Sequence, residues 1–349
     1  MKRIESDLDY FSIINMLDRV ARETGRDLGD EATSSDVLSQ VSAALSAHKK
    51  NPMRLHGLRV QAMFAHMAAA LGKCKIITAE DSGTIFTEDA DIRSPDFRIV
   101  TADGAQFLVE VKNCHNHNME KPYRLKSAYL ESLKKYAHCM GLPLKIAIFW
   151  SRWRVWTMLD VSSIACASQG AGVTMFEAIK KNEMAILGDM LLGTIPPLVF
   201  RVYADQTQPC TIGPDGEVPF TISDVAFYAG GNRIEEQAEK DLAWFFILYS
   251  QWAEIDTPVE IVNGKLKYME FCYAPDKADP NTRQGFELLG FLSSMISAKY
   301  AKATGKQNQV SLLNPTVDAD KLGVTIPDDY SGKVLKLWQF TAKPLTTAE

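Results

Sequence analysis

The sequence has no closely spaced cysteine pair, no long apolar run and no strong excess of charge of one sign. Its six cysteines are scattered along 349 residues, which argues against a zinc site and favours reduced thiols over a disulfide framework. No apolar run approaches the roughly 18 residues of a membrane span, and the charged first ten residues lack the apolar core of a signal peptide. We therefore expect a cytoplasmic protein that does not contact a membrane.

The charge is unevenly distributed. The chain has a net charge of −5, which argues against a protein that coats nucleic acid indiscriminately. Residues 110–154, however, contain nine basic and three acidic residues. A phosphate backbone bound along this segment would explain the local excess, and so would a solvated helix face. With 46% apolar and 23% charged residues, the rest of the composition is ordinary for a globular protein that buries a sizeable core.

A β-hairpin is predicted between residues 94 and 113. Residues 97–100 and 107–111 are strand-like apolar runs, and the segment between them contains an Asp-Gly pair, which favours a turn. Asp96 opens the first strand. Glu110 and Lys112 lie two residues apart in the second, so the alternation of a strand places both side chains on one face. The hairpin is thereby expected to bring two carboxylates and an ammonium together.

These groups suit the hydrolysis of a phosphodiester. Carboxylate oxygens, backbone carbonyls and waters hold Mg²⁺, and the ion lowers the pKa of a bound water and polarises phosphoryl oxygens. A nearby lysine can orient the attacking water or offset charge in the transition state. The alternative is purely structural: Asp96 is then a strand-entry residue, and Glu110 forms a surface pair with Lys112.

Pro95-Asp96 followed by Glu110-Val111-Lys112 resembles the motif of the PD-(D/E)xK nuclease superfamily. The resemblance implies a restriction-endonuclease-like α/β core, a mixed sheet flanked by helices, within a chain that is α+β as a whole. It also implies that Asp96 and Glu110 bind Mg²⁺ or Mn²⁺, that the carbonyl of Val111 is a further ligand, and that Lys112 is the catalytic lysine.

The helix predicted before the hairpin, at about residues 53–71, departs from the superfamily pattern. In many members this helix carries a glutamate that helps bind the metal or the water, but residues 55–70 contain no carboxylate. Gln61 is the nearest polar substitute, and we assign it an auxiliary catalytic role. The acidic segment at residues 80–91 is either an alternative source of a carboxylate or a solvated loop.

Segments after the motif predict the rest of the core. His115 and His117 favour a polar loop, with metal binding or proton transfer as the less favoured alternative. An amphipathic helix is expected at residues 121–140, followed by strands at 144–150 and 153–159.

We expect a helical extension at residues 1–50, a nuclease core at 51–160 and an α+β domain at 161–349 that serves specificity, regulation or dimerisation. The last domain should contain an Asn-Gly hairpin at 259–268 and a helix at 282–303.

The predicted activity is metal-dependent cleavage of nucleic acid, most simply as a DNA endonuclease, although the sequence does not distinguish DNA from RNA. The superfamily is rich in restriction and antiviral defence nucleases, which suggests that role by analogy alone. Cutting both strands usually calls for two active sites, which favours a homodimer, and residues 161–349 are the candidate place for a ligand or partner. Two rivals remain: an inactive nuclease fold that binds nucleic acid or a partner, and an interaction protein unrelated to nucleases.

Overall fold

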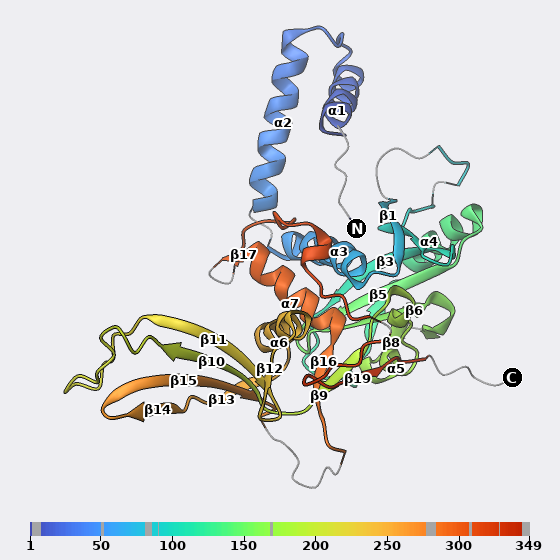
Figure 1. The fold of residues 1–349 in the computed structure, drawn as a ribbon. Coiled ribbons are helices and arrows are strands. Elements are labelled where there is room, and N and C mark those ends of the chain that lie inside the picture. The colour runs from blue at the N-terminus through green and yellow to red at the C-terminus, as the bar shows by residue number, and fades with distance from the viewer. Residues whose placement is uncertain are drawn as a thin grey trace, which may run out of the picture.

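The computed structural model describes residues 1, 8–49, 52–80, 86–89, 91–167, 170–276, 284–306, 309–327 and 329–343. Two helices, α1 (Leu8–Thr24) and α2 (Glu31–Lys49), form a hairpin that extends away from the body (Figure 1). No helix of the described residues is long and apolar enough to cross a membrane. The predicted helices of the N-terminal extension are thus present.

The central sheet has the strand order β1-β2-β3-β5-β6. Its strands are β1 (Cys74–Ala79), β2 (Phe97–Thr101), β3 (Gln106–Cys114), β5 (Leu144–Trp150) and β6 (Val155–Asp160). β3 and β5 are parallel, and the other neighbours are antiparallel, so the sheet is mixed. Gly104 has φ of +94° in the turn between β2 and β3, a conformation that glycine adopts without strain. The predicted hairpin is therefore confirmed.

Helices cover both faces of this sheet. The long helix α3 (Pro52–Leu71) packs Phe64 and Met67 against Val109 and Val111 of β3 in one cluster of buried residues. On the other face, α4 (Ser127–Met140) packs Leu130 and Leu133 against alternate residues of β3 and β5. This two-sided burial follows from the strand alternation, because successive residues of a strand point to opposite faces. The expected α+β class with a mixed sheet flanked by helices is confirmed.

The helix expected at residues 121–140 begins later than predicted. Residues Tyr123–Leu125 form strand β4, which pairs with β8 (Gly170–Val173), and β8 also pairs with β7 (Ala165–Ala167). Pro122 and the extended backbone of Lys126 keep this segment out of the helix. The prediction was wrong at that end because the basic residues of the segment matched a helix face as well as a strand.

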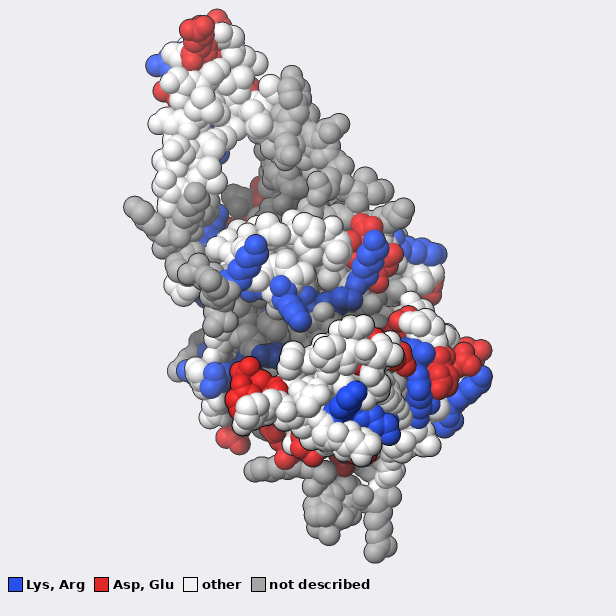
Figure 2. Space-filling model, turned by 60° about the vertical axis from the view of Figure 1, so that its left-hand side comes forward, with Lys and Arg blue, Asp and Glu red and all other residues white. Residues whose placement is uncertain are grey.

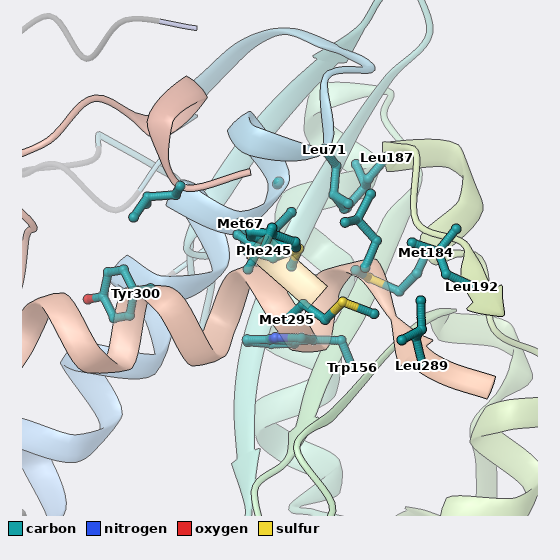
Figure 3. Packing of buried hydrophobic residues seen from close by; sticks show 14 of the residues in the cluster. Met67, Leu71, Trp156, Met184, Leu187, Leu192, Phe245, Leu289, Met295 and Tyr300 are labelled. Atoms are coloured by element: carbon teal, nitrogen blue, oxygen red, sulfur yellow. The ribbon is translucent and has the colours of Figure 1, made fainter. Parts of the chain in front are cut away.

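The second half of the chain packs onto the same core. Helices α6 (Gln237–Tyr249) and α7 (Leu292–Thr304) add Phe245 and Met295 to the cluster that contains Met67 and Trp156, as Figure 3 shows. The buried core therefore continues across residue 160, where we place the boundary of the nuclease domain. Trp156 donates a hydrogen bond to Ser297 Oγ at 2.9 Å, which anchors α7 to β6.

The remaining strands form a projecting sheet and smaller sheets. The projecting sheet, drawn at the lower left of Figure 1, has the order β12-β11-β10-β15-β13, and β14 pairs with β15. Its strands are β10 (Leu198–Ala204), β11 (Ile222–Ala229), β12 (Asn232–Ile234), β13 (Ala253–Asp256), β14 (Val259–Val262) and β15 (Lys265–Ala274). The smaller sheets comprise β9 (Leu191–Thr194), β16 (Glu287–Phe291) and β19 (Leu337–Phe340), and separately β17 (Gly305–Lys306) and β18 (Gln309–Val310). The short helices are α5 (Met175–Lys180), η1 (Val161–Ser163), η2 (Met184–Leu187) and η3 (Ala319–Lys321).

Two predictions for this half have different outcomes. The Asn-Gly hairpin is confirmed: Asn263 and Gly264 have φ of +52° and +75° between β14 and β15. The helix expected at residues 282–303 begins only at Leu292, because residues 287–291 form β16. Gly290, with φ of +119°, lies at an irregularity in that strand, and the apolar run around it gave no sign of the change from strand to helix.

Candidate active site on strands β2 and β3

The pairing of β2 with β3 places Asp96 beside the strand that carries Glu110. Phe97, the first residue of β2, pairs with Val109 in the antiparallel register, so Asp96 immediately precedes the paired segment. Asp96 Oδ2 also accepts a hydrogen bond of 2.7 Å from the backbone N–H of Val111. The end of the hairpin thus holds Asp96 against the strand that carries Glu110 and Lys112.

Gln61 reaches the same group from helix α3. Its Nε2 atom donates a hydrogen bond of 2.6 Å to Asp96 Oδ1. Gln61, the polar substitute identified in the sequence, therefore contacts Asp96, the predicted metal ligand. A glutamate in its place would add a third carboxylate beside Asp96 and Glu110.

Glu110 and Lys112 form an ion pair in a largely buried setting. Glu110 is only 2% exposed, and its Oε1 atom accepts hydrogen bonds from both Lys112 Nζ and the hydroxyl of Tyr129. Lys112 Nζ donates to Tyr129 Oη at 3.0 Å and lies 4.7 Å from the centre of the tyrosine ring. The second carboxylate oxygen, Oε2, accepts no hydrogen bond from the residues that the structure describes.

The environment fixes the protonation of Lys112. Burial alone disfavours its charged form, but the adjacent Glu110 carboxylate outweighs this effect and, with hydrogen bonds to Glu110 and Tyr129, raises the pKa of Lys112 above its ordinary value. Burial and the charge of Glu110 likewise raise the pKa of Tyr129 to about 12. At neutral pH Lys112 is thus an ammonium and Tyr129 a neutral phenol. Lys112 is therefore placed to donate hydrogen bonds.

Tyr129 contacts both Glu110 and Lys112, although its spacing in α4 is that of a packing residue. Its ring does lie against the core of that face. The signal available in the sequence was its hydroxyl, since leucine or phenylalanine would satisfy packing alone. Arg93 lies 5.6 Å from the Tyr129 ring centre and adds a cation beside it.

Other polar residues near the motif have separate partners. Glu80 accepts hydrogen bonds from Arg98 at 2.6 Å and Tyr136 at 2.5 Å, and Asp89 pairs with exposed Lys135. Glu80 and Asp89 thus have partners outside the motif, while Asp81 lies outside the described residues. His115 contacts Ser151 and Asn113 through its two ring nitrogens, and no group of three potential metal-ligating side chains occurs among the described residues.

Comparison with solved structures gives a distant similarity. The chain is similar to a Holliday junction resolvase from the archaeal hyperthermophile Archaeoglobus fulgidus at 17% identity, with a TM-score of 0.22. The match covers 27% of this chain and 74% of the resolvase. No protein-family model and no curated protein sequence matches.

Proposed function

We propose that this protein is a metal-dependent nuclease that hydrolyses phosphodiester bonds, with DNA as the substrate. The observation that supports the proposal is the ion pair of Glu110 with Lys112 on one face of β3, beside the hydrogen bond that Asp96 accepts from the N–H of Val111. The site lies at the junction of β2, β3, α3 and α4, so each functional side chain comes from a packed element of the fold. Rigid elements suit a catalytic site, because small displacements of reacting groups are costly.

The residues present fit Mg²⁺ or Mn²⁺. Asp96 and Glu110 are carboxylates, and the carbonyls of Val111 and Gln61 are further oxygen donors. Mg²⁺ usually keeps several waters and takes one or two carboxylates, so it does not require a cluster of three acidic side chains. Glu110 Oε2, which has no protein hydrogen bond among the described residues, offers an oxygen for this purpose. The bound ion would polarise a phosphoryl oxygen and acidify a water.

Lys112 and Tyr129 serve the reaction by charge and position. As an ammonium, Lys112 donates hydrogen bonds to the attacking water or to a phosphoryl oxygen and offsets the charge that develops there. Tyr129 holds Lys112 and Glu110 together through its hydroxyl, and it is a positioning residue. The guanidinium of Arg93 lies beside the Tyr129 ring and is available to bind a neighbouring phosphate of the substrate.

The surface charge supports a polyanionic substrate. Residues 110–154, which include most of this site and all of α4, contain nine basic and three acidic residues. Figure 2 shows one face of the molecule, on which lysine and arginine side chains lie across the middle and acidic and basic side chains are mixed lower down. Lys112, Lys134, Lys135 and Lys145 form ion pairs. The remaining basic side chains of the segment would attract a phosphate backbone even on an acidic protein.

A second candidate function is binding of nucleic acid without cleavage. It is favoured by Gln61, which occupies the place of a helix carboxylate and contacts Asp96 directly. A site of this kind would bind nucleic acid equally well in the presence of chelator and in the Asp96→Ala variant. The nuclease instead requires both the metal and the carboxylate.

Metal binding tests the proposal before any cleavage is measured. Titration calorimetry with Mn²⁺ should show saturable binding by the intact chain, and Glu110→Gln should weaken it by about tenfold or more. Glu131→Gln, in an exposed glutamate of α4 that pairs with Lys134, is the matched control and should bind as wild type does. Equal binding by all three proteins would remove Glu110 from the metal site.

A further inference from the structure

A cavity lies on the face of the sheet opposite Lys112. It has a volume of about 310 Å³ and lies between α3, α7 and the ends of β3 and β5, with Asn113 and Phe149 on the strand side and Ser294 on the helix side. Asn113 follows Lys112 in β3, so the alternation of the strand directs the two side chains to opposite faces. The cavity is therefore close to the proposed active site along the chain but separate from it.

Two polar atoms at this cavity are buried without a hydrogen-bond partner among the described residues. One is Ser294 Oγ, in a residue that is only 6% exposed, and the other is Asn113 Oδ1. The amide nitrogen of Asn113 lies 2.9 Å from His115 Nε2. If the amide is turned around, the nitrogen takes the place of the unpartnered oxygen, so one polar atom lacks a partner in either orientation. A buried polar group without a hydrogen-bond partner costs folding free energy, so its presence calls for an explanation. A ligand that supplies the missing partner is one such explanation.

The charge of the lining selects an anion. The residues around the cavity include Arg59, Arg154, His56 and His115 but no aspartate or glutamate. Arg59 is engaged by Thr304 and the carbonyl of Ala301, whereas Arg154 forms no hydrogen bond or ion pair with a described residue. Arg154 is held in the left-handed region with φ of +55° in the β5–β6 turn. A strained, exposed and unpaired arginine at a cavity mouth is suited to an anionic ligand.

A second cavity continues along the same side of α7. Its volume is about 440 Å³, it shares Arg154, Ser294 and Ala298 with the first, and it adds Arg152 without adding a carboxylate. Ser294 and Ala298 are four residues apart and so lie on one face of the helix. The two cavities thus share part of their lining, and each is large enough for a ligand that extends beyond a single small anion.

The ligand must also have a flat, partly apolar part. Phe149, a wall of the first cavity, is half-buried and packs on Trp156 with ring centres 4.8 Å apart. A simple phosphate would meet Arg154 but would leave the buried polar atoms of Asn113 and Ser294 unpaired and most of the volume unfilled. A heteroaromatic ring with hydrogen-bonding edges satisfies these atoms and contacts Phe149.

We propose that this cavity binds a nucleoside phosphate. The base lies against Phe149 and hydrogen-bonds with Asn113 and Ser294, and the phosphate is met by Arg154. The nucleotide is either free in solution or one unit of a nucleic acid strand that passes over the recess. The binding site goes beyond the proposed cleavage reaction, because none of its contacts involves Asp96, Glu110 or Lys112.

The test is direct binding by the full chain with EDTA present. Titration calorimetry with the adenosine, guanosine, cytidine and uridine monophosphates and with a short single-stranded oligonucleotide should give saturable binding of at least one ligand, whereas inorganic phosphate should bind at least tenfold more weakly. Binding of a mononucleotide identifies a free ligand, and binding of the oligonucleotide alone identifies a unit of a strand. Lys112→Ala should bind as wild type does, which separates this result from the outcome of a cleavage assay.

Two variants locate the binding. Arg154→Gln and Ser294→Ala should each weaken it by about tenfold, and Arg124→Gln, in an exposed arginine outside both cavities, should leave it unchanged. Ser294→Ala should also leave the protein at least as stable as wild type, since it removes an unpaired buried hydroxyl. Absence of binding to every nucleotide and oligonucleotide, or binding by both variants as tight as that of wild type, would overturn the proposal.

Discussion

Asp96 accepts a hydrogen bond of 2.7 Å from the backbone N–H of Val111, the residue between the other two members of the motif. This contact ties the residue before β2 to the middle of β3. The geometry of the site therefore depends on the hairpin register, which the apolar residues of both strands determine by their burial against α3 and α4.

Tyr129 should contribute to activity through Lys112 and Glu110. Tyr129→Phe removes the hydroxyl that bonds to both, so kcat should fall by about tenfold with little change in KM. Tyr136→Phe is the matched control, because it removes a hydroxyl two turns further along α4 that bonds to Glu80 instead. Cleavage rates measured over a series of substrate concentrations give kcat and KM for both variants. Equal values for the two variants would leave Tyr129 with a packing role only.

Gln61→Glu tests whether a cation binds beside Asp96. The new carboxylate would replace a hydrogen bond of 2.6 Å with repulsion between like charges, so the melting temperature without metal should fall. Mg²⁺ would offset this repulsion, and the metal-dependent rise in melting temperature should be larger than in wild type. Thermal unfolding with and without Mg²⁺ measures both effects. A variant that melts low and gains nothing from Mg²⁺ speaks against a metal at this position.

Asp189 should make stability depend on pH. Burial raises its pKa to about 6, although its carboxylate accepts hydrogen bonds from the N–H and hydroxyl of Ser293 at the start of α7. The unfolded chain keeps this group ionised down to about pH 4. Its protonation therefore stabilises the fold as pH falls from about 6 to 4, and this contribution is lost as pH rises through 6.

The corresponding experiment is urea unfolding of wild type and Asp189→Asn at pH 4.5 and pH 7. Relative to the variant, wild type should gain roughly 2 kcal/mol of unfolding free energy at the lower pH. The comparison removes the contribution of the other carboxylates, which titrate in both proteins. Parallel pH dependence in the two proteins would mean that Asp189 ionises normally.

Glu239 should be important for stability. It is 4% exposed on α6, and its carboxylate accepts hydrogen bonds from the backbone N–H groups of three successive residues, Lys333, Val334 and Leu335. Glu239→Gln places an amide against these donors and should lower the free energy of unfolding by about 3 kcal/mol. Glu236→Gln, one turn earlier and exposed, should change it little. Denaturant unfolding of both variants gives the comparison.

Much of the site could be predicted because its residues lie close in sequence. The Asp-Gly turn predicted the hairpin that carries Asp96, and the alternation of β3 was enough to place Glu110 and Lys112 on one face. Gln61 was identified only through the resemblance, since no local pattern links residue 61 to residue 96. Tyr129 was missed because a tyrosine in an apolar stripe has the same spacing whether its hydroxyl meets solvent or a buried ion pair.

Long-range packing was the part that the sequence did not predict. Trp156, in the predicted strand at 153–159, donates a hydrogen bond to Ser297 on a helix that is distant in sequence. The cavity between α3 and α7 depends on that contact, so Ser294 and Arg154 could not be associated before the structure placed α7 against β6. The roles of the predicted domain at 161–349 and of a homodimer stay predictions.

The central claim is tested most directly by a cleavage assay. Supercoiled plasmid, linear duplex and single strands are incubated with Mg²⁺ or Mn²⁺ and wild type, Asp96→Ala or Lys112→Ala, with EDTA added to a parallel wild-type reaction. We predict cleavage of DNA by wild type alone, loss of cleavage with EDTA, and a decrease of at least about a thousandfold in both variants, each of which should fold by circular dichroism. Cleavage that persists in Lys112→Ala, or a wild-type protein that cuts none of the substrates, would contradict the account.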